Sequence, residues 1–530
     1  MASGELIVIL AVAAVTLLAV ATLRRVGVPT AAALVVAGLV IGFLPFVPDV
    51  SLDPHLVLLG LLPLLVFDAA ATSSATAFVR NARSIGLLAV GLVAATALGV
   101  AAVTHWLGHL PWAMAFVLGT AVGPTDAAAA TSMARRLGLP RRLVTILEGE
   151  ALFNDGAAIV LYTAAVTAAT SGAFEAPHAL GEIVYASTAG TAIGLAVGVV
   201  GRALRDRIDD PPIEIAGSML MAYAAYLPAE ALHASGVLAA VSAGLYLGWH
   251  SGGSAFSARS RLQFNAFWET LVFLINAALF VAVGLSFHTF TEQARGPVGR
   301  LVLTGIVVVV AVIVIRLVWM EGTGWITRLL RRGPPPDEAH ALDQAGWRQR
   351  LVIGWAGMRG AITLALLLAV PLTTNAGRPL AGRDDIIYLG FAVIIVTLVG
   401  QGMSLPLLVR RLGLTEHPAF ADAERRARLA LTQAVIDRLQ SARDGDGVAP
   451  EFIDGLRAQY LARRQRLELG DEAEVVQEAA VAAGAERALR RDLIDAQREA
   501  LARLRRERRI GATTTRKLEH DLDLEDARLS

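Results

Sequence analysis

The sequence predicts an all-α polytopic membrane protein with a helical cytoplasmic tail. Of its 530 residues, 55% are hydrophobic and only 18% are charged, and the mean hydropathy is +0.56. This composition is too apolar for an ordinary soluble protein. The apolar residues also gather in runs of about 20, the length of a membrane-crossing helix, and about 13 such runs are present.

The predicted spans all lie before residue 412. The first run has no basic residue before it and further runs follow, so we expect a first span and not a cleaved signal. The predicted spans are 5–23, 28–46, 55–71, 85–107, 111–134, 143–169, 183–204, 213–232, 237–249, 262–287, 301–329, 351–372 and 386–408.

Residues 123–156 place four acids, Asp126, Glu148, Glu150 and Asp155, inside or beside long apolar segments. A charge at the middle of a spanning helix costs roughly 2.5–3.5 kcal/mol even on insertion scales, so such residues usually mark a path for an ion or a substrate. On a helix, Glu150 shares one face with Asn154, four residues later, and Asp155 lies on the adjoining face. We interpret this stretch as an ion site.

The fifth span is predicted to break just before Asp126. Pro124 has no N–H and its ring would clash with the carbonyl of Thr120, and Gly123 stands beside it. A helix broken at mid-membrane leaves free backbone groups that can face an ion.

A second break is predicted at 354–360, where three glycines surround Arg359 in the twelfth span. The two breaks lie seven spans apart. An odd spacing inverts the second copy of a repeat, so we expect two inverted repeats joined by a linker helix. Arg359 is expected to compensate helix-end dipoles at this break or to anchor the core.

Arginine in alternate loops predicts the orientation, with the N-terminus outside and the C-terminus in the cytoplasm. The loops expected outside hold only Arg295, Arg300, Arg378 and Arg383. The loops expected inside hold Arg24, Arg25, Arg80, Arg83, Arg135, Arg136, Arg141, Arg142, Arg202, Arg205, Arg207, Arg259, Arg261, Arg328, Arg331, Arg332, Arg410 and Arg411.

The composition changes after the last span to Arg-, Glu- and Ala-rich sequence. We therefore predict a transmembrane domain at 1–412 and a helical cytoplasmic tail at 413–530. An apolar seam in the tail is expected to serve packing or dimerisation, with a regulatory role as the alternative. Its members are Leu489, Leu493, Ala496, Ala500 and Leu504.

Three stretches carry a resemblance to a known family. The stretch GPTDAAAATSMARRLGLPRRLVTILEGEALFNDGAAIVLY resembles the signature of bacterial sodium/proton antiporters of the monovalent cation:proton antiporter-1 family, which also contains the animal sodium/proton exchangers. FWETLVFLINAALFVAVGL and GWAGMRGAITLALLLAVP agree in order and spacing. Together they cover most of the chain up to residue 412.

The resemblance implies a secondary antiporter of the plasma membrane that serves pH homeostasis by exchanging Na⁺ or Li⁺ for H⁺. It also implies a homodimer in which core helices move against a dimerisation scaffold. The family's Asn-Asp pair, here Asn154 and Asp155, implies electroneutral exchange.

Asp155 is the residue expected to carry either the proton or the cation. One carboxylate cannot hold both favourably, so each should exclude the other. Thr125 and Asp126, at the first break, offer hard oxygen donors that suit Na⁺. We therefore expect Na⁺ to bind at Asp155, Thr125 and Asp126.

Two positions depart from the family pattern. Asp68 stands where the family usually has Glu, and it is either a further ligand or an interfacial residue. Ala151 stands where the family commonly has a Ser hydroxyl, so that a water molecule or Asp68 would have to substitute.

Glu150 resembles the family's structural acid, and we expect it to pair with Arg316. That arginine is the only basic residue in the run 306–319. An unpaired charge at this depth would be costly, so each of the two predicts the other.

Other functions fit less well. Net charge of +1 predicts no bulk attraction to nucleic acid, and the lack of Cys excludes thiolate chemistry. We find no phosphate loop or nucleophile elbow, so we expect neither an enzyme nor a cofactor. The alternatives are a K⁺/H⁺ antiporter of the same family, a cation channel, or an intramembrane aspartyl protease, for which the Gly-x-Gly-Asp stretch is missing.

Overall fold

The computed structural model describes residues 28–44, 55–73, 85–172, 176–205, 210–250, 258–293, 298–330, 346–414, 418–442 and 450–469, with a few isolated positions besides. The predicted first span, 5–23, lies outside these residues apart from Thr22, and so do Leu489 and Leu504 of the predicted tail seam. The chain forms two compact units, Met1–Glu416 and His417–Ser530.

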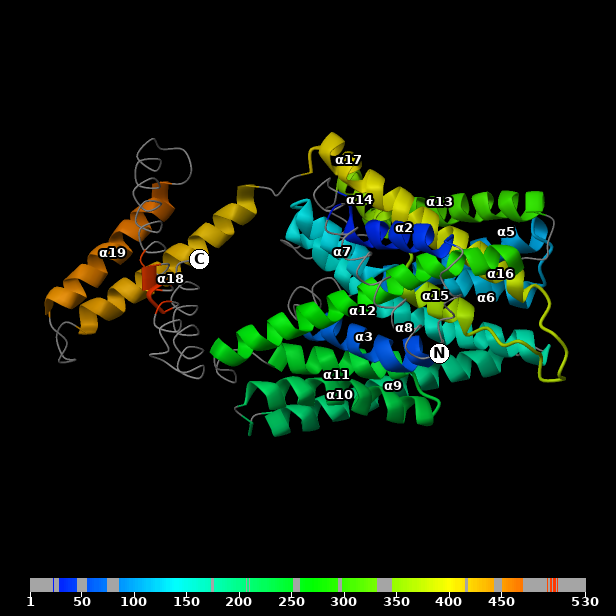
Figure 1. The fold of residues 1–530 in the computed structure, drawn as a ribbon, viewed down its shortest axis with the longest axis horizontal. Coiled ribbons are helices and arrows are strands. Elements are labelled where there is room, and N and C mark those ends of the chain that lie inside the picture. The colour runs from blue at the N-terminus through cyan, green and yellow to red at the C-terminus, as the bar shows by residue number, and fades with distance from the viewer. Residues whose placement is uncertain are drawn as a thin grey trace. The chain divides into compact units, whose positions relative to one another are not determined.

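The described part of the first unit is helical (Figure 1), with one isolated bridge between Thr373 and Pro379, and the all-α prediction is confirmed there. The helices are α2 Thr30–Gly42, α3 Leu62–Ala71, α5 Val93–Trp106, α6 Trp112–Ala121, α7 Ala127–Arg136, α8 Arg141–Ser171, α9 Ala176–Arg205, α10 Pro211–Ala231, α11 Gly236–His250, α12 Ala258–Gln293, α13 Val298–Leu330, α14 Trp347–Trp355, α15 Ala361–Leu368, α16 Arg383–Ile395 and α17 Gly402–Leu412.

Among the described residues, six helices are long and apolar enough to cross a membrane. They include α8, α9, α12 and α13, and the total of about 13 spans stays a prediction. Two of the six contain a π-helical turn. These turns, Leu87–Leu92 before α5 and Val396–Gln401 before α17, each carry a glycine at the fifth position.

Helix α8 carries Glu150, Asn154 and Asp155 of the candidate site. It begins directly after Pro140 and ends at Gly172, whose φ of 76° is a left-handed conformation that suits glycine, and whose N–H donates to the carbonyl of Ala168 at 3.0 Å. At 31 residues it is about 46 Å long, more than enough to cross a bilayer.

The helices of this unit pack in two groups. Helices α9, α10 and α11 lie side by side along one edge (Figure 1), and with α3 and α12 they share one apolar core. Helices α5 to α8 share the largest core with α13 to α16. Helix α15 contributes Ala361 and Ala365 to the first core and Leu364 and Leu366 to the second, so the second broken span lies where the two groups meet.

Glycines allow the close helix approaches that a membrane fold needs. A side chain at Gly119 would strike the backbone of Ala97 on α5, and one at Gly284 on α12 would strike the backbone of α2. Dense backbone packing of this kind leaves little room for larger residues at these crossings.

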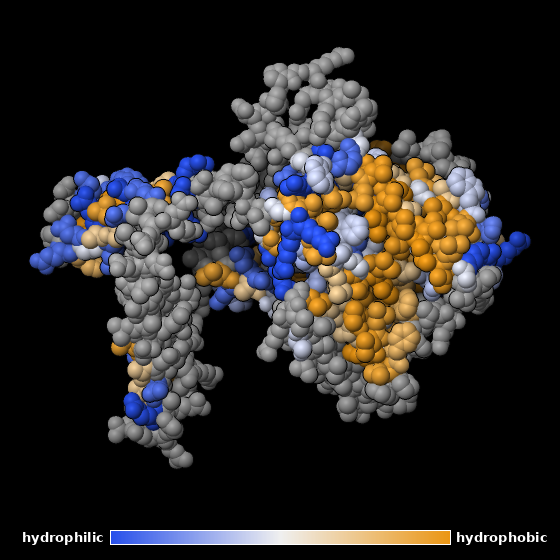
Figure 2. Space-filling view, turned by 90° about the horizontal axis from the view of Figure 1, so that it is seen from above, coloured by the Kyte–Doolittle hydropathy of each residue, from blue (hydrophilic) through white to orange (hydrophobic). Residues whose placement is uncertain are grey.

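A large part of one face of the unit is apolar, as expected for contact with lipid. Figure 2 shows a broad hydrophobic surface with hydrophilic residues beside it. On α13, exposed aliphatic side chains recur every four residues, at Val302, Ile306, Val310, Val314 and Val318.

The second unit contains α18, Pro418–Ala442, and α19, Pro450–Leu469, which pack against each other. Ile436 and Ile453 are buried, and Arg464 Nη1 donates to Gln433 Oε1 at 2.8 Å. A helical pair is therefore present in the region where the sequence predicts a helical tail.

Candidate ion-binding site

The predicted interruption of the fifth span is present. Helix α6 ends at Ala121, α7 begins at Ala127, and the chain between them is not helical. Asp126 caps α7, since its Oδ1 accepts from the N–H of Ala129 at 3.0 Å. Pro124 and Gly123 thus lie within the break, where neither has to extend a helical ladder.

The second predicted break is also present, between the end of α14 at Trp355 and the start of α15 at Ala361. The two breaks touch, because the N–H of Asp126 donates to the carbonyl of Met358 at 2.7 Å. A side chain at Gly360 would overlap the Asp126 carboxylate. The second break therefore packs directly against Asp126 in the first break.

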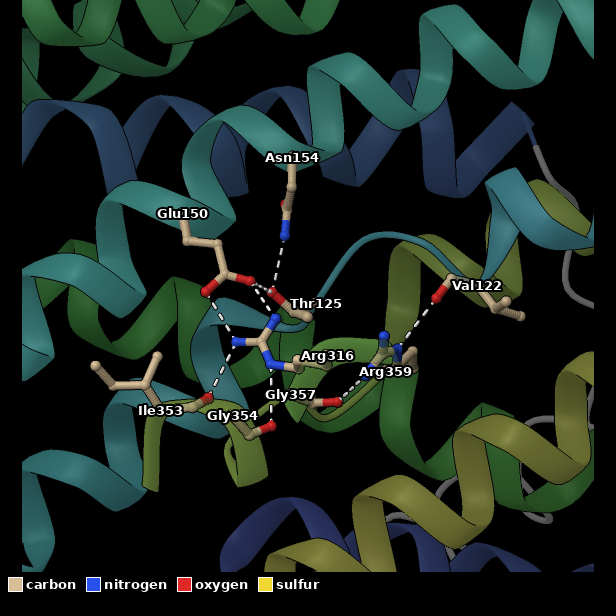
Figure 3. A network of polar contacts seen from close by, with 9 residues as sticks. All are labelled: Val122, Thr125, Glu150, Asn154, Arg316, Ile353, Gly354, Gly357 and Arg359. Carbon is tan, nitrogen blue, oxygen red and sulfur yellow. Dashed lines mark hydrogen bonds and ion pairs between the residues drawn. The ribbon is translucent and has the colours of Figure 1, made fainter. Parts of the chain in front are cut away.

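Arg359 is fully buried and joins the two breaks (Figure 3). Its Nε donates to the carbonyl of Val122 at 3.1 Å, its Nη1 donates to the carbonyl of Gly357, and its backbone N–H donates to Thr397 Oγ1 at 3.1 Å. Val122 is the residue at the C-terminal end of α6. The positive charge therefore lies at the negative end of a half-helix, and that half-helix belongs to the first broken span.

Glu150 and Arg316 form a buried bidentate pair, as expected from the sequence. Arg316 Nη2 lies 2.8 Å from Glu150 Oε2, and Nη1 contacts Oε1. Arg316 also donates to the last carbonyls of α14, from Nε to Gly354 at 3.1 Å and from Nη2 to Ile353 at 3.2 Å. One arginine thus neutralises the acid and caps the other half-helix.

Thr125 connects this pair to Asn154 (Figure 3). Its hydroxyl donates to Glu150 Oε1 at 3.2 Å and accepts from Asn154 Nδ2 at 2.8 Å. A hydroxyl has one proton and two lone pairs, so a single lone pair is left for a cation. The Thr125 carbonyl accepts no hydrogen bond within the described part of the chain.

Asp155 is buried but has no such partners. Its Oδ1, and Oδ1 of Asn154 beside it, are inaccessible to solvent and accept no hydrogen bond from any residue that the structure describes. Buried oxygens of this kind normally have a partner, so the arrangement suits the binding of a proton or a cation.

The other predicted acids lie apart from this network. Asp68 is part-buried on α3, and its carboxylate makes no hydrogen bond or ion pair with the described residues. Glu148 pairs with Arg135 at 2.5 Å, where both side chains are partly exposed. Ala151 is buried one turn before Asp155. The ligand role of Asp68 stays a prediction.

No pattern in the sequence pointed to Met358 or Thr363 as residues of the site. The glycines around Arg359 were a signal for the close approach at Gly360, but no local pattern marks a carbonyl that faces another helix break. Thr363 is buried on α15, and its hydroxyl has no hydrogen-bond partner among the described residues. In sequence it resembles any other helical threonine.

Known proteins resemble this chain over most of its length. Residues 10–411 match the family described as sodium/hydrogen exchanger, transmembrane. A Na⁺/H⁺ exchanger of Mycobacterium tuberculosis, itself uncharacterized, is 37% identical over 99% of this chain and 96% of its own length. The Na⁺/H⁺ antiporter NhaH of Halobacillus dabanensis is 30% identical over 77% of this chain and 98% of its own length.

The fold is similar to that of a solved antiporter. The structure of the sodium proton antiporter MjNhaP1 from Methanocaldococcus jannaschii at pH 8 has a TM-score of 0.60, with 17% identity, and the match covers 77% of this chain and 99% of that one. The family match, the relatives and the shared fold agree with the resemblance seen in the sequence. The chain belongs to the sodium/hydrogen exchanger family of multi-pass membrane transporters.

Proposed function

We propose that this chain is a secondary antiporter of the plasma membrane that exchanges cytoplasmic Na⁺ or Li⁺ for external H⁺ by alternating access. The observation that carries the proposal is the buried Asp155 carboxylate beside the crossing of two helix breaks, with an oxygen that has no partner among the described residues. The named antiporters among the relatives support Na⁺ as the cargo.

Asp155 is the exchanging group. A buried carboxylate without a partner is stable only when a proton or a cation neutralises it, and the two compete for the same oxygens. Asn154 brings no second charge. One proton therefore replaces one Na⁺, and the exchange is electroneutral.

The cation binds between α8 and the first break. Asp155 supplies a carboxylate, Thr125 its carbonyl and the remaining lone pair of its hydroxyl, and Asp126 a second carboxylate. Hard oxygen ligands of this kind suit Na⁺. Asp68 on α3 is a reserve ligand that reaches the ion through water.

The two helix groups have different roles in alternating access. The group that contains α6, α8 and the crossed breaks moves with the ion, and the group of α9 to α11 is the scaffold across which two copies form a homodimer. The two broken spans belong to two inverted repeats. The N-terminus lies outside and the tail inside, in keeping with the loop arginines.

Proton flux in proteoliposomes tests this function. Purified protein is reconstituted with a pH-sensitive dye inside the vesicles, and Na⁺, Li⁺ or K⁺ is added separately. We expect Na⁺ and Li⁺ to drive proton flux. Flux with K⁺ alone would assign the K⁺/H⁺ alternative, and cation current without proton flux would indicate a channel.

A further inference from the structure

Three buried oxygens near the crossing of the breaks have no hydrogen-bond partner among the described residues. They are Oδ1 of Asp155, Oδ1 of Asn154 and Oγ1 of Thr363. The first two lie on α8 and the third on α15, three residues past the second break. A buried polar atom without a partner is costly, so three of them in one region point to a ligand.

A hydrogen bond between α8 and α15 indicates where Thr363 lies along these helices relative to the candidate site. Tyr162 Oη donates to the carbonyl of Leu366 at 2.7 Å, which fixes the register of the two helices. On α8, Asp155 lies two turns before Tyr162, and its neighbour Asn154 donates to Thr125, which adjoins Asp126, the residue against which Gly360 packs. The helices therefore run in the same direction.

Along α15, Thr363 lies between Gly360 and Leu366. It precedes Leu366 by three residues, so the two share a face of α15, and it follows Gly360 by three. One helical turn is about 5.4 Å long, so Thr363 lies within about one turn of the level of Asp155, on its external side.

The hydroxyl of Thr363 lies just after the break and has no hydrogen-bond partner among the described residues. Most buried threonines in these helices donate to the carbonyl four residues earlier, as Thr120 does to Phe116 at 2.9 Å and Thr397 to Val393 at 2.8 Å. The residue four before Thr363 is Arg359, which lies within the break. No helical carbonyl is in place for the hydroxyl, which leaves both its proton and its lone pairs available.

We infer that Thr363 supplies a hydroxyl ligand to the transported cation from the second broken span. The cation then has ligands from both breaks, with the Asp126 and Thr125 groups on one side and Thr363 on the other. The hydroxyl also provides an oxygen that Ala151, on the same side of α8 as Asp155, cannot supply. This inference rests on the proposed function, because it assigns a ligand within the same site.

Thr363→Val separates this role from a structural one. The substitution keeps the shape of the side chain and removes only the hydroxyl. Since that hydroxyl makes no hydrogen bond to the described residues, a structural role predicts a neutral or slightly stabilising effect. A ligand role predicts that the Na⁺ concentration for half-maximal proton flux rises about tenfold, the change expected for one lost polar contact.

The experiment compares Thr363→Val with two matched variants. Thr363→Ser keeps the hydroxyl and should retain the affinity of the unmodified protein. Thr304→Val makes the same chemical change at another fully buried threonine whose hydroxyl has no partner among the described residues, but on α13, where its methyl group faces Gly108. Thr304 is 12 residues from Arg316, about 18 Å along the helix, so its loss should leave Na⁺ affinity unchanged.

Two readouts keep the inference distinct from the proposed function. Proton flux reports exchange, and the rise of the melting temperature of the purified protein with Na⁺ concentration reports binding alone. Unchanged Na⁺ affinity in Thr363→Val by both readouts, or an equal loss in Thr363→Ser or Thr304→Val, would overturn the ligand role. If Na⁺ stabilises the unmodified protein and Thr363→Val needs about tenfold more, but no proton flux occurs, the ligand role stands and the antiport fails.

Discussion

Glu150 and Asp155 lie five residues apart on the same helix, and both are buried, yet their surroundings are opposite. Glu150 is held by the two terminal guanidinium nitrogens of Arg316 and by the Thr125 hydroxyl. Asp155 keeps an oxygen with no hydrogen-bond donor in the described part of the chain. The comparison contrasts a carboxylate that is compensated by an arginine with one that has an oxygen lacking a partner among the described residues.

The physical reason is charge compensation. A buried carboxylate that is matched by an arginine stays ionised and gains nothing from a cation, whereas an unmatched one must take up a proton or a cation to remain buried. The two acids look alike in the sequence, but the structure surrounds them differently. Glu150 is held by an ion pair at the crossing, and Asp155 is the acid that we propose for exchange.

Two glycines of the second break repeat this contrast. A side chain at Gly357 would overlap Arg316, whereas a side chain at Gly360 would overlap the carboxylate of Asp126. One glycine thus lies against the fixed pair and the other against the predicted ion ligands. Substitutions at the two positions should separate stability from transport.

The largest expected effect is that of Asp155→Asn. The amide keeps the volume of the side chain but cannot alternate between proton and cation, so we expect Na⁺-driven proton flux to be abolished while the protein stays folded. Flux in proteoliposomes and the thermal melt are the measurements. Glu148→Gln, the same kind of change at a partly exposed acid of α8, should retain flux. Normal flux in Asp155→Asn would refute its role.

The next largest effect falls on stability. Glu150→Ala or Arg316→Ala leaves an uncompensated buried charge, which should lower the free energy of unfolding by about 3–5 kcal/mol. The Na⁺ affinity of protein that survives should change less. Replacing both residues by alanine should cost less than the sum of the two single changes, because neither charge is then left alone. A melt like that of the unmodified protein in both single variants would show that the pair is not structural.

The apparent Na⁺ affinity should weaken as the pH falls. Protons occupy the same carboxylate as Na⁺, so lowering the pH removes the form that binds the cation, and the effect approaches ~tenfold per pH unit once the protonated form dominates. Half-maximal Na⁺ concentrations for proton flux at several pH values measure this. A constant affinity across the range would contradict competition at Asp155.

The same flux should not depend on membrane potential. If Asp126 or Asp68 carried a second proton, the cycle would move charge and would gain ~2.3 kcal/mol per charge per 100 mV. Rates are compared with the potential clamped at zero and at a large negative value. Equal rates support one-for-one exchange, and voltage-dependent rates would exclude it.

The smallest effects are expected at the two glycines. Gly357→Ala crowds Arg316 and should lower stability by ~1–3 kcal/mol with little change in Na⁺ affinity. Gly360→Ala crowds the Asp126 carboxylate and should weaken Na⁺ binding more than it lowers the melting temperature. Melts and flux titrations of both variants test this, and the reverse pattern would contradict the division between the two acids.

The sequence alone determined the features that depend on local chemistry. Hydropathy runs located the helices, and Pro124 and the glycines around Arg359 located both breaks, because backbone rules act within a few residues. The Glu150–Arg316 pair was also predictable, although the two residues are 166 positions apart. Charges at that depth are so costly that Arg316, the only basic residue in the apolar run 306–319, is the natural partner.

Only the tertiary structure decided which helix ends meet. Arg359 caps the C-terminal end of α6 through a carbonyl 237 residues away, and the carbonyl of Met358 holds the N–H of Asp126. The tertiary structure also engaged the Thr125 hydroxyl, and it gave that of Thr363 no hydrogen-bond partner among the described residues. These contacts follow from how all the helices pack, and no periodicity or spacing in the chain specifies them, because backbone carbonyls look the same at every position of a sequence.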